Sequence, residues 1–434
     1  MLYRHITDLI GGTPLLRLDP AGHGLPGVDL YAKLESWNPF GSVKDRAAWA
    51  MIADRLPEMT RDRRTIVEAS SGNTAKALQV LAAMHGLGVR AYTNRAKVGE
   101  VRDLLRLLGA DVHELPGLSE CPDPTAPDDV FTTIERLMAA EPDTYLHPSQ
   151  YTNERNVQAH YEGTGREIHD DLGHVDYLFG GLGTTGSTRG AATYLREHNP
   201  SLRTVGVVAS RAGFIPGIRS ETELWEVGLF QPGFYHRIVP VDPGDAVDAT
   251  LGLAARYGVL AGPTGGATYA AALEVLRGRP AGEGPVTAVL IVCDRIEPYL
   301  SYFRKHRPGL FGDTPDRTAI SDADLAAVPQ LTPQELAARR DGRLVIDTRG
   351  GMAYRIGHVP GSINIRDDHL DDLLAQGSPF PPSTPVVFVC PVGERSTRLA
   401  ALAQRTGQDA AGLAGGIVAW RDAGLPLESS ARRE

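Results

Sequence analysis

Cysteine is scarce in this 434-residue chain, which has only Cys121, Cys293 and Cys390. An odd number of widely spaced cysteines does not form the disulfide framework of a small secreted protein. No CxxC pair and no histidine at metal-ligand spacing accompanies them, so the sequence predicts no metal site. A functional thiol would have to be recognised from its local sequence.

Long apolar runs and a basic excess are also missing. No window of 18 apolar residues occurs, and the start, MLYRHITDLIGG, lacks the pattern of a signal peptide. We therefore expect a cytoplasmic protein with no membrane partner. The 44 Lys and Arg are outnumbered by 53 Asp and Glu, a net charge of −9, which argues against broad nucleic-acid binding.

What the sequence does contain is a long alternation of apolar strands and helical segments. The chain is longer than one hydrophobic core supports, so we expect more than one domain. Between about residues 27 and 300 the alternation predicts parallel sheets covered by helices. The polar stretch 306–330 is expected to be a linker, and the pattern then restarts. We predict an α/β protein with domains at 1–305 and 331–434.

The first chemical motif is SWNPFGSVKDRAAW, in which Lys44 lies at the start of a predicted amphipathic helix. The positive end of the helix dipole disfavours an ammonium group, which favours a nucleophilic amine capable of imine chemistry. Most lysines are solvated at the surface, so this motif alone favours a surface lysine.

A second motif, TIVEASSGNTAKAL, places a polar loop between a predicted strand and a predicted helix. Its backbone amides and hydroxyls could hold a carboxylate. An ordinary turn in which Ser70 or Asn73 caps the helix explains the loop equally well.

A third motif, GGLGTTGSTRG, has the GxGxxG spacing of a dinucleotide site at Gly181, Gly183 and Gly186. A dinucleotide site also needs an acidic residue after the next strand, but that strand ends in Ser210 and Arg211. The hydroxyls of Thr184, Thr185 and Ser187 add hydrogen-bond donors to the backbone amides of the loop. These donors suit a single terminal phosphate better than a pyrophosphate, which argues against a dehydrogenase.

Together these segments resemble the fold-type II pyridoxal-phosphate enzymes of the cysteine synthase and cystathionine β-synthase group. The matching stretches are GGTPLLRL, KLESWNPFGSVKDRAAWAMI, SSGNTAKAL, HPSQYTNERNVQAHYEGTGREI, GGLGTTGSTRG and GVLAGPTGGATYAAAL. The resemblance implies a front domain of two α/β subdomains with parallel or mixed sheets, pyridoxal 5'-phosphate as cofactor, and a homodimer.

The resemblance also implies residue roles. Lys44 would hold the cofactor as an imine, Asn73 would face the pyridine 3-oxygen, and Thr264 would lie beside the ring nitrogen. The phosphate loop would comprise Gly183, Thr184, Thr185, Gly186 and Ser187. The substrate would be bound by Ser70, Ser71, Gly72, Thr74 and Gln150.

A hydroxyl beside the ring nitrogen makes the cofactor a moderate electron sink, which favours loss of a β-substituent over transamination. The implied activity is that of a transferase of EC 2.5.1 type. Lys44 would remove the α-proton of O-phospho-L-serine or O-acetyl-L-serine, and the resulting aminoacrylate would take up a nucleophile.

Two departures from the family pattern bear on specificity. Phe40 stands where a glycine is usual, and the loop SRAGFIPGIRSETELWEVG replaces a glycine-rich substrate loop. Arg219 in this loop resembles the arginine with which O-phosphoserine-using members hold the leaving phosphate. An exposed Arg219 paired with Glu221 or Glu223 is an equally good interpretation.

The stretch VVFVCPVGERSTRLA places Cys390 between a predicted strand and a predicted helix, as an exposed thiol at a strand end. Backbone amides of the loop and the helix dipole would stabilise a thiolate or persulfide. A buried structural cysteine is the alternative. The proline and charged residues of the loop favour a reactive sulfur.

With LVIDTRGGMAYRIGHVPGSINI and GLAGGIVAWRDAGLPL, this stretch resembles single-domain rhodaneses over about residues 331–428. The resemblance implies Cys390 as a persulfide carrier, with Arg395 near the sulfur donor. It also implies that Asp347, Arg349 and His358 support the fold. The acidic Glu394 beside the sulfur disfavours thiosulfate as the donor.

The fusion suggests that the Cys390 persulfide delivers sulfur to the front site, giving cysteine or a related thiol amino acid. A small-molecule sulfur donor or a sulfur-carrier protein would load the rear domain. Two alternatives stay open. The front domain could desulfurate cysteine and feed sulfur to the rear domain, or it could join an amine nucleophile to the activated serine, as in diaminopropionate pathways.

Overall fold

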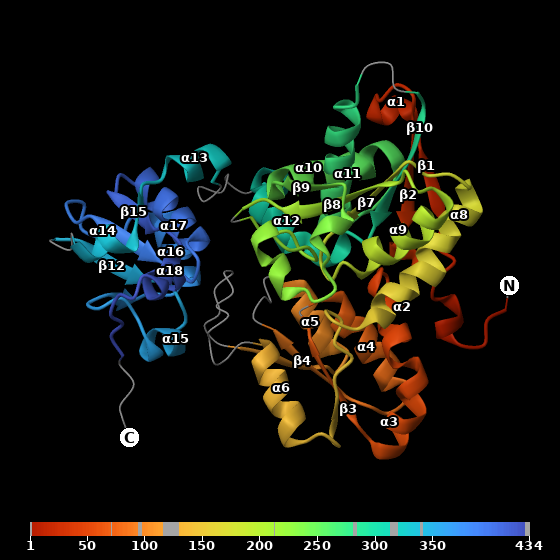
Figure 1. The fold of residues 1–434 in the computed structure, drawn as a ribbon, viewed down its shortest axis with the longest axis horizontal. Coiled ribbons are helices and arrows are strands. Elements are labelled where there is room, and N and C mark those ends of the chain that lie inside the picture. The colour runs from red at the N-terminus through yellow and green to blue at the C-terminus, as the bar shows by residue number, and fades with distance from the viewer. Residues whose placement is uncertain are drawn as a thin grey trace. The chain divides into compact units, whose positions relative to one another are not determined.

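The chain divides into two units (Figure 1). The front unit comprises residues 1–113 and 134–311, and the rear unit comprises residues 114–133 and 312–434. In this computed structural model the described residues are 2–70, 72–93, 98–115, 130–211, 213–280, 284–312, 320–338 and 342–429. The domain limits at 305 and 331 stay a prediction.

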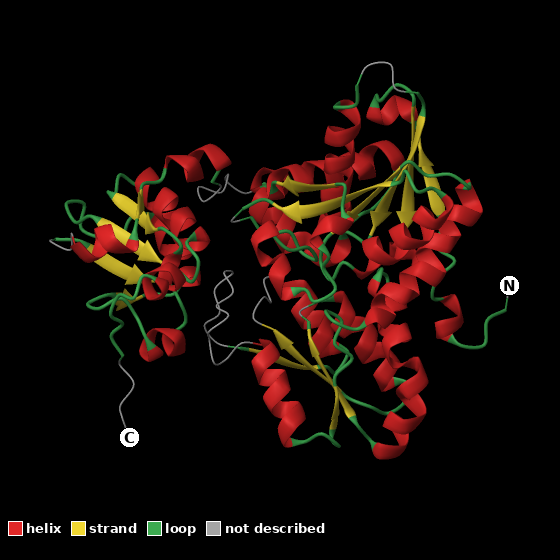
Figure 2. Ribbon diagram, viewed as in Figure 1, coloured by secondary structure: helices red, strands yellow, loops and turns green. Residues whose placement is uncertain are grey.

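One subdomain of the front unit is built on a six-stranded sheet with helices on both faces (Figure 2). In spatial order its strands are β1 (Leu15–Leu18), β2 (Val28–Leu34), β10 (Val286–Val292), β7 (Tyr177–Gly181), β8 (Arg203–Ala209) and β9 (Arg237–Val241). Only β1 runs antiparallel to its neighbour. The covering helices include α8 (Arg166–Leu172), α9 (Gly186–His198), α10 (Pro243–Tyr257) and α11 (Pro263–Arg277). Both faces are buried, which explains the apolar runs of the central strands.

The other subdomain of the front unit has a four-stranded sheet of β5 (Asp111–Glu114), β4 (Val89–Thr93), β3 (Thr65–Ala69) and β6 (Tyr145–Leu146). Its helices are α2 (Lys44–Ile52), α3 (Leu56–Asp62), α4 (Asn73–Ala83), α5 (Gly99–Leu107) and α6 (Val130–Ala140). Helix α7 (Glu154–Ala159) and the π-helical turn η4 (His160–Gly165) lead back to α8. The predicted pair of α/β subdomains is confirmed.

The rear unit has a five-stranded parallel sheet in the order β11 (Gln330–Leu331), β15 (Ala410–Leu413), β14 (Val386–Val389), β12 (Leu344–Asp347) and β13 (Ile363–Asn364). Its helices are α13 (Asp322–Ala327), α14 (Pro333–Ala338), α15 (Gly351–Ile356), α16 (Asp367–Gln376), α17 (Glu394–Arg405) and α18 (Gly416–Asp422). The predicted small α/β domain is confirmed.

The stretch expected to be a linker is partly ordered. Helix α13 lies within it, and Ser321 accepts a hydrogen bond from the Asp324 amide while the Asp324 carboxylate accepts one from the Ser321 amide. This reciprocal cap stabilises a short helix without an apolar periodicity, which is why the sequence pattern missed it. Residues 313–319 of the stretch lie outside the described residues.

A buried cluster of charges joins the two subdomains of the front unit. The guanidinium of Arg46 on α2 lies 2.7 Å from a carboxylate oxygen of Glu35 and 2.7 Å from one of Glu167. Lys33 lies 2.7 Å from Glu167, and the Thr13 hydroxyl donates to Glu35 at 2.8 Å. Burial alone would raise the pKa of Glu35, but the charge and hydrogen bonds of Arg46, with the hydrogen bond from Thr13, together outweigh burial and lower that pKa. The cluster therefore holds its charges in matched pairs.

Among the described residues, we find no helix that is long and apolar enough to cross a membrane.

Replacing Arg46 by methionine would leave the fully buried Glu35 without its counter-ion. We expect Arg46→Met to lower the free energy of unfolding by about 3 to 5 kcal/mol. Arg17→Met is the matched control, because Arg17 pairs with Asp29 at the surface, where such a pair contributes about 1 kcal/mol or less. Denaturant unfolding of the full chain measures both, and equal losses would contradict the role assigned to the cluster.

Candidate active site

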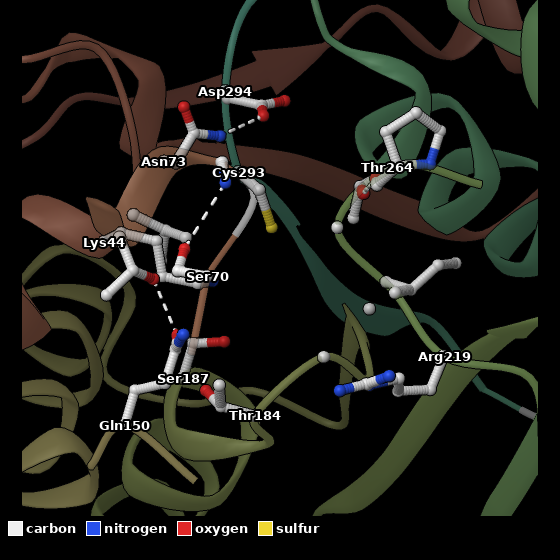
Figure 3. Close-up of a pocket in the computed structure, with 18 of the residues that line it drawn as sticks. Lys44, Ser70, Asn73, Gln150, Thr184, Ser187, Arg219, Thr264, Cys293 and Asp294 are labelled. Atoms are coloured by element: carbon white, nitrogen blue, oxygen red, sulfur yellow. Dashed lines mark hydrogen bonds between the residues drawn. The ribbon is translucent and has the colours of Figure 1, made fainter. Parts of the chain in front are cut away.

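A pocket between the two subdomains of the front unit brings most of the predicted site residues together (Figure 3). The predicted residues that line it are Lys44, Ser70, Gly72, Asn73, Thr74, Gln150, Gly183, Thr184, Thr185, Ser187, Arg219 and Thr264. Gly186 is the first residue of α9, immediately beside them. Ser71 lies outside the described residues.

Lys44 is the first residue of α2 and lies at the pocket, as the motif predicted. Two contacts fix its backbone: the Val43 amide donates to the Cys293 carbonyl at 2.8 Å, and the Lys44 amide donates to the Ser42 hydroxyl at 3.2 Å. Asp45 is fully buried and accepts hydrogen bonds from the Phe40 amide and the Ser42 hydroxyl. Burial raises the pKa of Asp45 to about 6. The turn before the lysine is therefore closed by internal hydrogen bonds.

The loop between β7 and α9 is built as an anion cradle. It ends at the N-terminus of a 13-residue helix, whose first amides and dipole favour a phosphate. Glycine is required twice: a Cβ on Gly183 would lie 2.5 Å from the Gly217 carbonyl oxygen, and one on Gly186 would lie 2.1 Å from Asn156. Thr185 adopts a positive φ of 65°, a strained conformation for a non-glycine residue.

Asn73 and Thr264 face the pocket from the starts of two helices. Asn73 is the first residue of α4, and its side-chain amide donates to Asp294 at 2.6 Å. Thr264 is buried near the start of α11, and its hydroxyl donates to the Pro216 carbonyl at 2.6 Å.

The predicted carboxylate-binding residues lie together at the end of β3. The Thr74 hydroxyl donates to the Gln150 side-chain oxygen at 2.6 Å, and the Gln150 amide nitrogen donates to the Ala69 carbonyl at 2.8 Å. Ser149, just before Gln150, has a positive φ of 58°. The glutamine is thus held in place by contacts on both ends of its amide.

Arg219 is buried, with 8% of its surface exposed, so the interpretation as an exposed surface arginine is wrong. Its guanidinium donates to the Tyr151 hydroxyl at 3.1 Å and lies over the Tyr151 ring. Figure 3 shows the side chain reaching into the pocket from the loop that follows β8. A buried cation at a pocket wall favours an anionic ligand.

Among the further residues of the pocket wall that the sequence motifs did not reveal are Cys293, Asp294 and Tyr299. Cys293 and Asp294 follow β10, and Tyr299 lies in the short turn after them. Burial raises the pKa of Cys293, so this thiol stays protonated at neutral pH. The sequence feature that could have revealed Cys293 and Asp294 is VLIVCD, an apolar strand that ends in these two residues.

In the rear unit, Cys390 follows β14, and α17 begins at Glu394. The Gly393 amide donates to the Cys390 sulfur at 3.1 Å, and the Ser396 hydroxyl lies 3.4 Å from the same sulfur. Gly393 has a positive φ of 96°, which lets the loop turn its amide towards the sulfur. The expectation of an exposed thiol is wrong, because Cys390 is 0% exposed.

The buried Arg395 pairs with Asp367 at 3.2 Å and with Asp371 at 2.5 Å. The role of Arg395 near a sulfur donor stays a prediction.

Supporting contacts also surround the other predicted residues of the rear unit. Arg349 pairs with the fully buried Asp347 at 2.7 Å and donates to the Gly357 carbonyl. His358 contacts the Tyr354 carbonyl at 2.7 Å and stacks on the Tyr354 ring.

Comparisons with known proteins agree with this geometry. The family model for pyridoxal-phosphate dependent enzymes matches residues 6–294, and the model for the rhodanese-like domain matches residues 332–423. Cysteine synthase B of Salmonella typhimurium is 32% identical over 320 residues, covering 71% of this chain and 96% of the relative.

Two other similar proteins differ in their printed activities. N-(2-amino-2-carboxyethyl)-L-glutamate synthase of Cupriavidus metallidurans is 32% identical, over 69% of this chain and 89% of the relative. The crystal structure of a hydrogen sulfide-producing enzyme from Fusobacterium nucleatum superposes with a TM-score of 0.61 at 30% identity, over 69% of this chain and 100% of that one.

The chain therefore belongs to the pyridoxal-phosphate dependent enzymes, and its cofactor is pyridoxal phosphate. More particularly, it is a cysteine synthase-type enzyme that replaces the β-substituent of an activated serine, with a rhodanese-like domain after it. The residues present fit the cofactor. The amine of Lys44, the glycine-containing loop 183–187 and the hydroxyl of Thr264 line one pocket.

Proposed function

We propose that the chain is a sulfur-transferring β-replacement enzyme whose sulfur arrives as a persulfide on Cys390. The product is cysteine or a related thiol amino acid. The observation that supports this is the backbone amide of Gly393 directed at the Cys390 sulfur, in the same chain as the Lys44 pocket. A tether between the two raises the effective concentration of sulfur at the pocket.

The atoms balance if a thiol reductant takes part. The terminal sulfur of the persulfide forms the new bond to the β-carbon of the activated serine, whose leaving group departs with its electron pair. Two equivalents of a small thiol then reduce the S–S bond that joins Cys390 to the product, which gives the thiol's own disulfide, free cysteine and the Cys390 thiol. A small-molecule persulfide or a sulfur-carrier protein reloads it.

Several of the predicted site residues have a proposed task. Bound pyridoxal phosphate supplies an electron sink that acidifies the α-proton of the substrate. The Lys44 amine holds the cofactor and moves that proton, and the loop 183–187 binds the phosphate. The pair Thr74 and Gln150, with Ser70, Ser71 and Gly72, orients the substrate carboxylate.

We propose O-phospho-L-serine as the preferred substrate, because Arg219 supplies a buried cation at the pocket wall. A phosphate leaving group carries more charge than an acetate and gains more from a bidentate guanidinium.

We expect Arg219→Gln to lower kcat/KM for O-phosphoserine by about 30- to 100-fold, the cost of losing a charged hydrogen bond. The value for O-acetylserine should change little. Arg256→Gln, at an exposed position of α10, is the matched control, and Lys44→Ala should abolish both reactions and covalent attachment of the cofactor. Equal losses for both serine esters would refute the leaving-group role.

The sulfur source is tested by single turnover. The full chain is loaded with polysulfide, desalted, and mixed with O-phosphoserine and a thiol reductant. We expect about one cysteine per chain from the native protein and none from Cys390→Ser, while the rate with free sulfide stays unchanged. Cys293→Ser is the matched control. Equal yields from Cys390→Ser and the native protein would exclude delivery by Cys390.

Two alternative activities are each favoured by one specific similarity. The similarity to the Cupriavidus enzyme favours an amine such as glutamate as nucleophile, and the similarity to the Fusobacterium enzyme favours release of sulfide from cysteine. Two further incubations of the full chain separate them. O-phosphoserine with glutamate gives an N-linked product in the first case, and cysteine alone is consumed in the second.

We also propose a homodimer formed through the front unit. Large apolar side chains are exposed near its N-terminus: Leu2, Ile6, Leu9, Leu16 and Trp37. Leu16 lies on β1, at the edge of the six-stranded sheet, where a second copy could cover it. Sedimentation equilibrium should give about twice the chain mass of 46.6 kDa, and a monomer at all concentrations would contradict the proposal.

A further inference from the structure

Three buried side chains meet at the end of β10. Asp294 accepts a hydrogen bond from the Asn73 side-chain amide at 2.6 Å and a short one from the Tyr299 hydroxyl, both on the same oxygen. The Asn73 nitrogen also lies 3.3 Å from the Tyr299 oxygen. Asp294 is 6% and Tyr299 is 4% exposed, so water does not compete for these contacts. We call this group the Asp294 triad.

The Asp294 triad decides which end of the Asn73 amide faces the carboxylate. A carboxylate attracts the NH₂ end of an amide and repels its carbonyl. The NH₂ group carries two hydrogens. The Asp294 and Tyr299 oxygens are hydrogen-bonded to each other, so they lie on the same side of the Asn73 nitrogen and share one of these hydrogens. The second hydrogen remains for an oxygen atom in the pocket, where Figure 3 shows Asn73 beside Asp294 at the pocket wall.

The backbone of Cys293 and Asp294 also connects two other parts of the site. The Cys293 carbonyl accepts from the Val43 amide at 2.8 Å, and the Asp294 carbonyl accepts from the Gly262 amide at 3.0 Å. The Asp294 carboxylate lies close against the backbone of Gly262, since a Cβ on Gly262 would be 2.1 Å from it. Asp294 is therefore fixed relative to both Lys44 and Thr264.

We propose that Asp294, supported by Tyr299, is a positioning residue that makes Asn73 present an N–H to the 3-oxygen of the cofactor ring. That N–H stabilises the ionised ring oxygen, whereas a reversed amide would favour the protonated form. The inference rests on the proposed contact between Asn73 and the cofactor.

A double-mutant cycle with a spectroscopic readout tests the proposal. The variants are Asn73→Ala, Asp294→Ala, both together, Asp294→Asn, and Asp248→Ala as a control whose carboxylate pairs with Arg307 at the surface. Two quantities are measured on the full chain: the apparent dissociation constant of pyridoxal phosphate, and the ratio of visible to near-ultraviolet absorbance of the bound cofactor. Thermal unfolding of each variant is measured alongside.

We expect Asp294→Ala to weaken cofactor binding by about tenfold and to lower the absorbance ratio. In the Asn73→Ala background the same substitution should have no further effect on either quantity, because Asp294 acts through Asn73. Asp294→Asn keeps a carbonyl that can accept from Asn73 and should recover most of both. The Asp248→Ala control should change neither.

The possible failures are distinguishable. If Asn73→Ala leaves both quantities unchanged, the proposed contact of Asn73 with the cofactor is wrong. If Asn73→Ala changes them but Asp294→Ala does not, or if the two effects add in the double variant, the positioning role is overturned. Should Asp294→Ala fail to fold, Tyr299→Phe keeps the ring, removes the hydroxyl donor, and is expected to lower the same absorbance ratio.

Discussion

The buried pairing of Arg46 with two glutamates is the interaction on which the front unit depends. Glu35 follows β2 and Glu167 lies on α8, so one guanidinium ties α2 to the six-stranded sheet and its covering helix. Because Lys44 lies two residues before Arg46 on the same helix, the cluster also fixes where the amine can be. The positive charge of Arg46 is balanced by Glu35 and Glu167.

The end of β10 has a comparable organising role on the other side of the pocket. Its last residues accept backbone hydrogen bonds from the turn before Lys44 and from the start of α11, and the Asp294 carboxylate binds Asn73. Three helix N-termini thus converge on one strand end, as expected where parallel strands finish at a common edge. Helix starts supply amides, and amides suit an anionic cofactor.

The sequence predicted those site residues that lie in local motifs. Lys44, Asn73 and the loop 183–187 each lie in a short local motif, and the resemblance of the whole set of motifs to one family implied their roles, although each motif alone also fitted a surface lysine or an ordinary turn. Asp294 was missed because its partner Asn73 lies 221 residues earlier, and no local pattern records that pairing. Arg219 stayed ambiguous for a similar reason, since only the tertiary structure shows that it is buried against Tyr151.

The two described cysteines show why residue type alone does not assign a sulfur chemistry. Cys293 lines the pocket, yet burial raises the pKa of its thiol, which disfavours the anion that would react. Cys390 is also buried, but an amide N–H points at its sulfur and a 12-residue helix begins four residues later. An N–H donor and a helix N-terminus are groups that favour a negative charge, and Cys390 has both beside it.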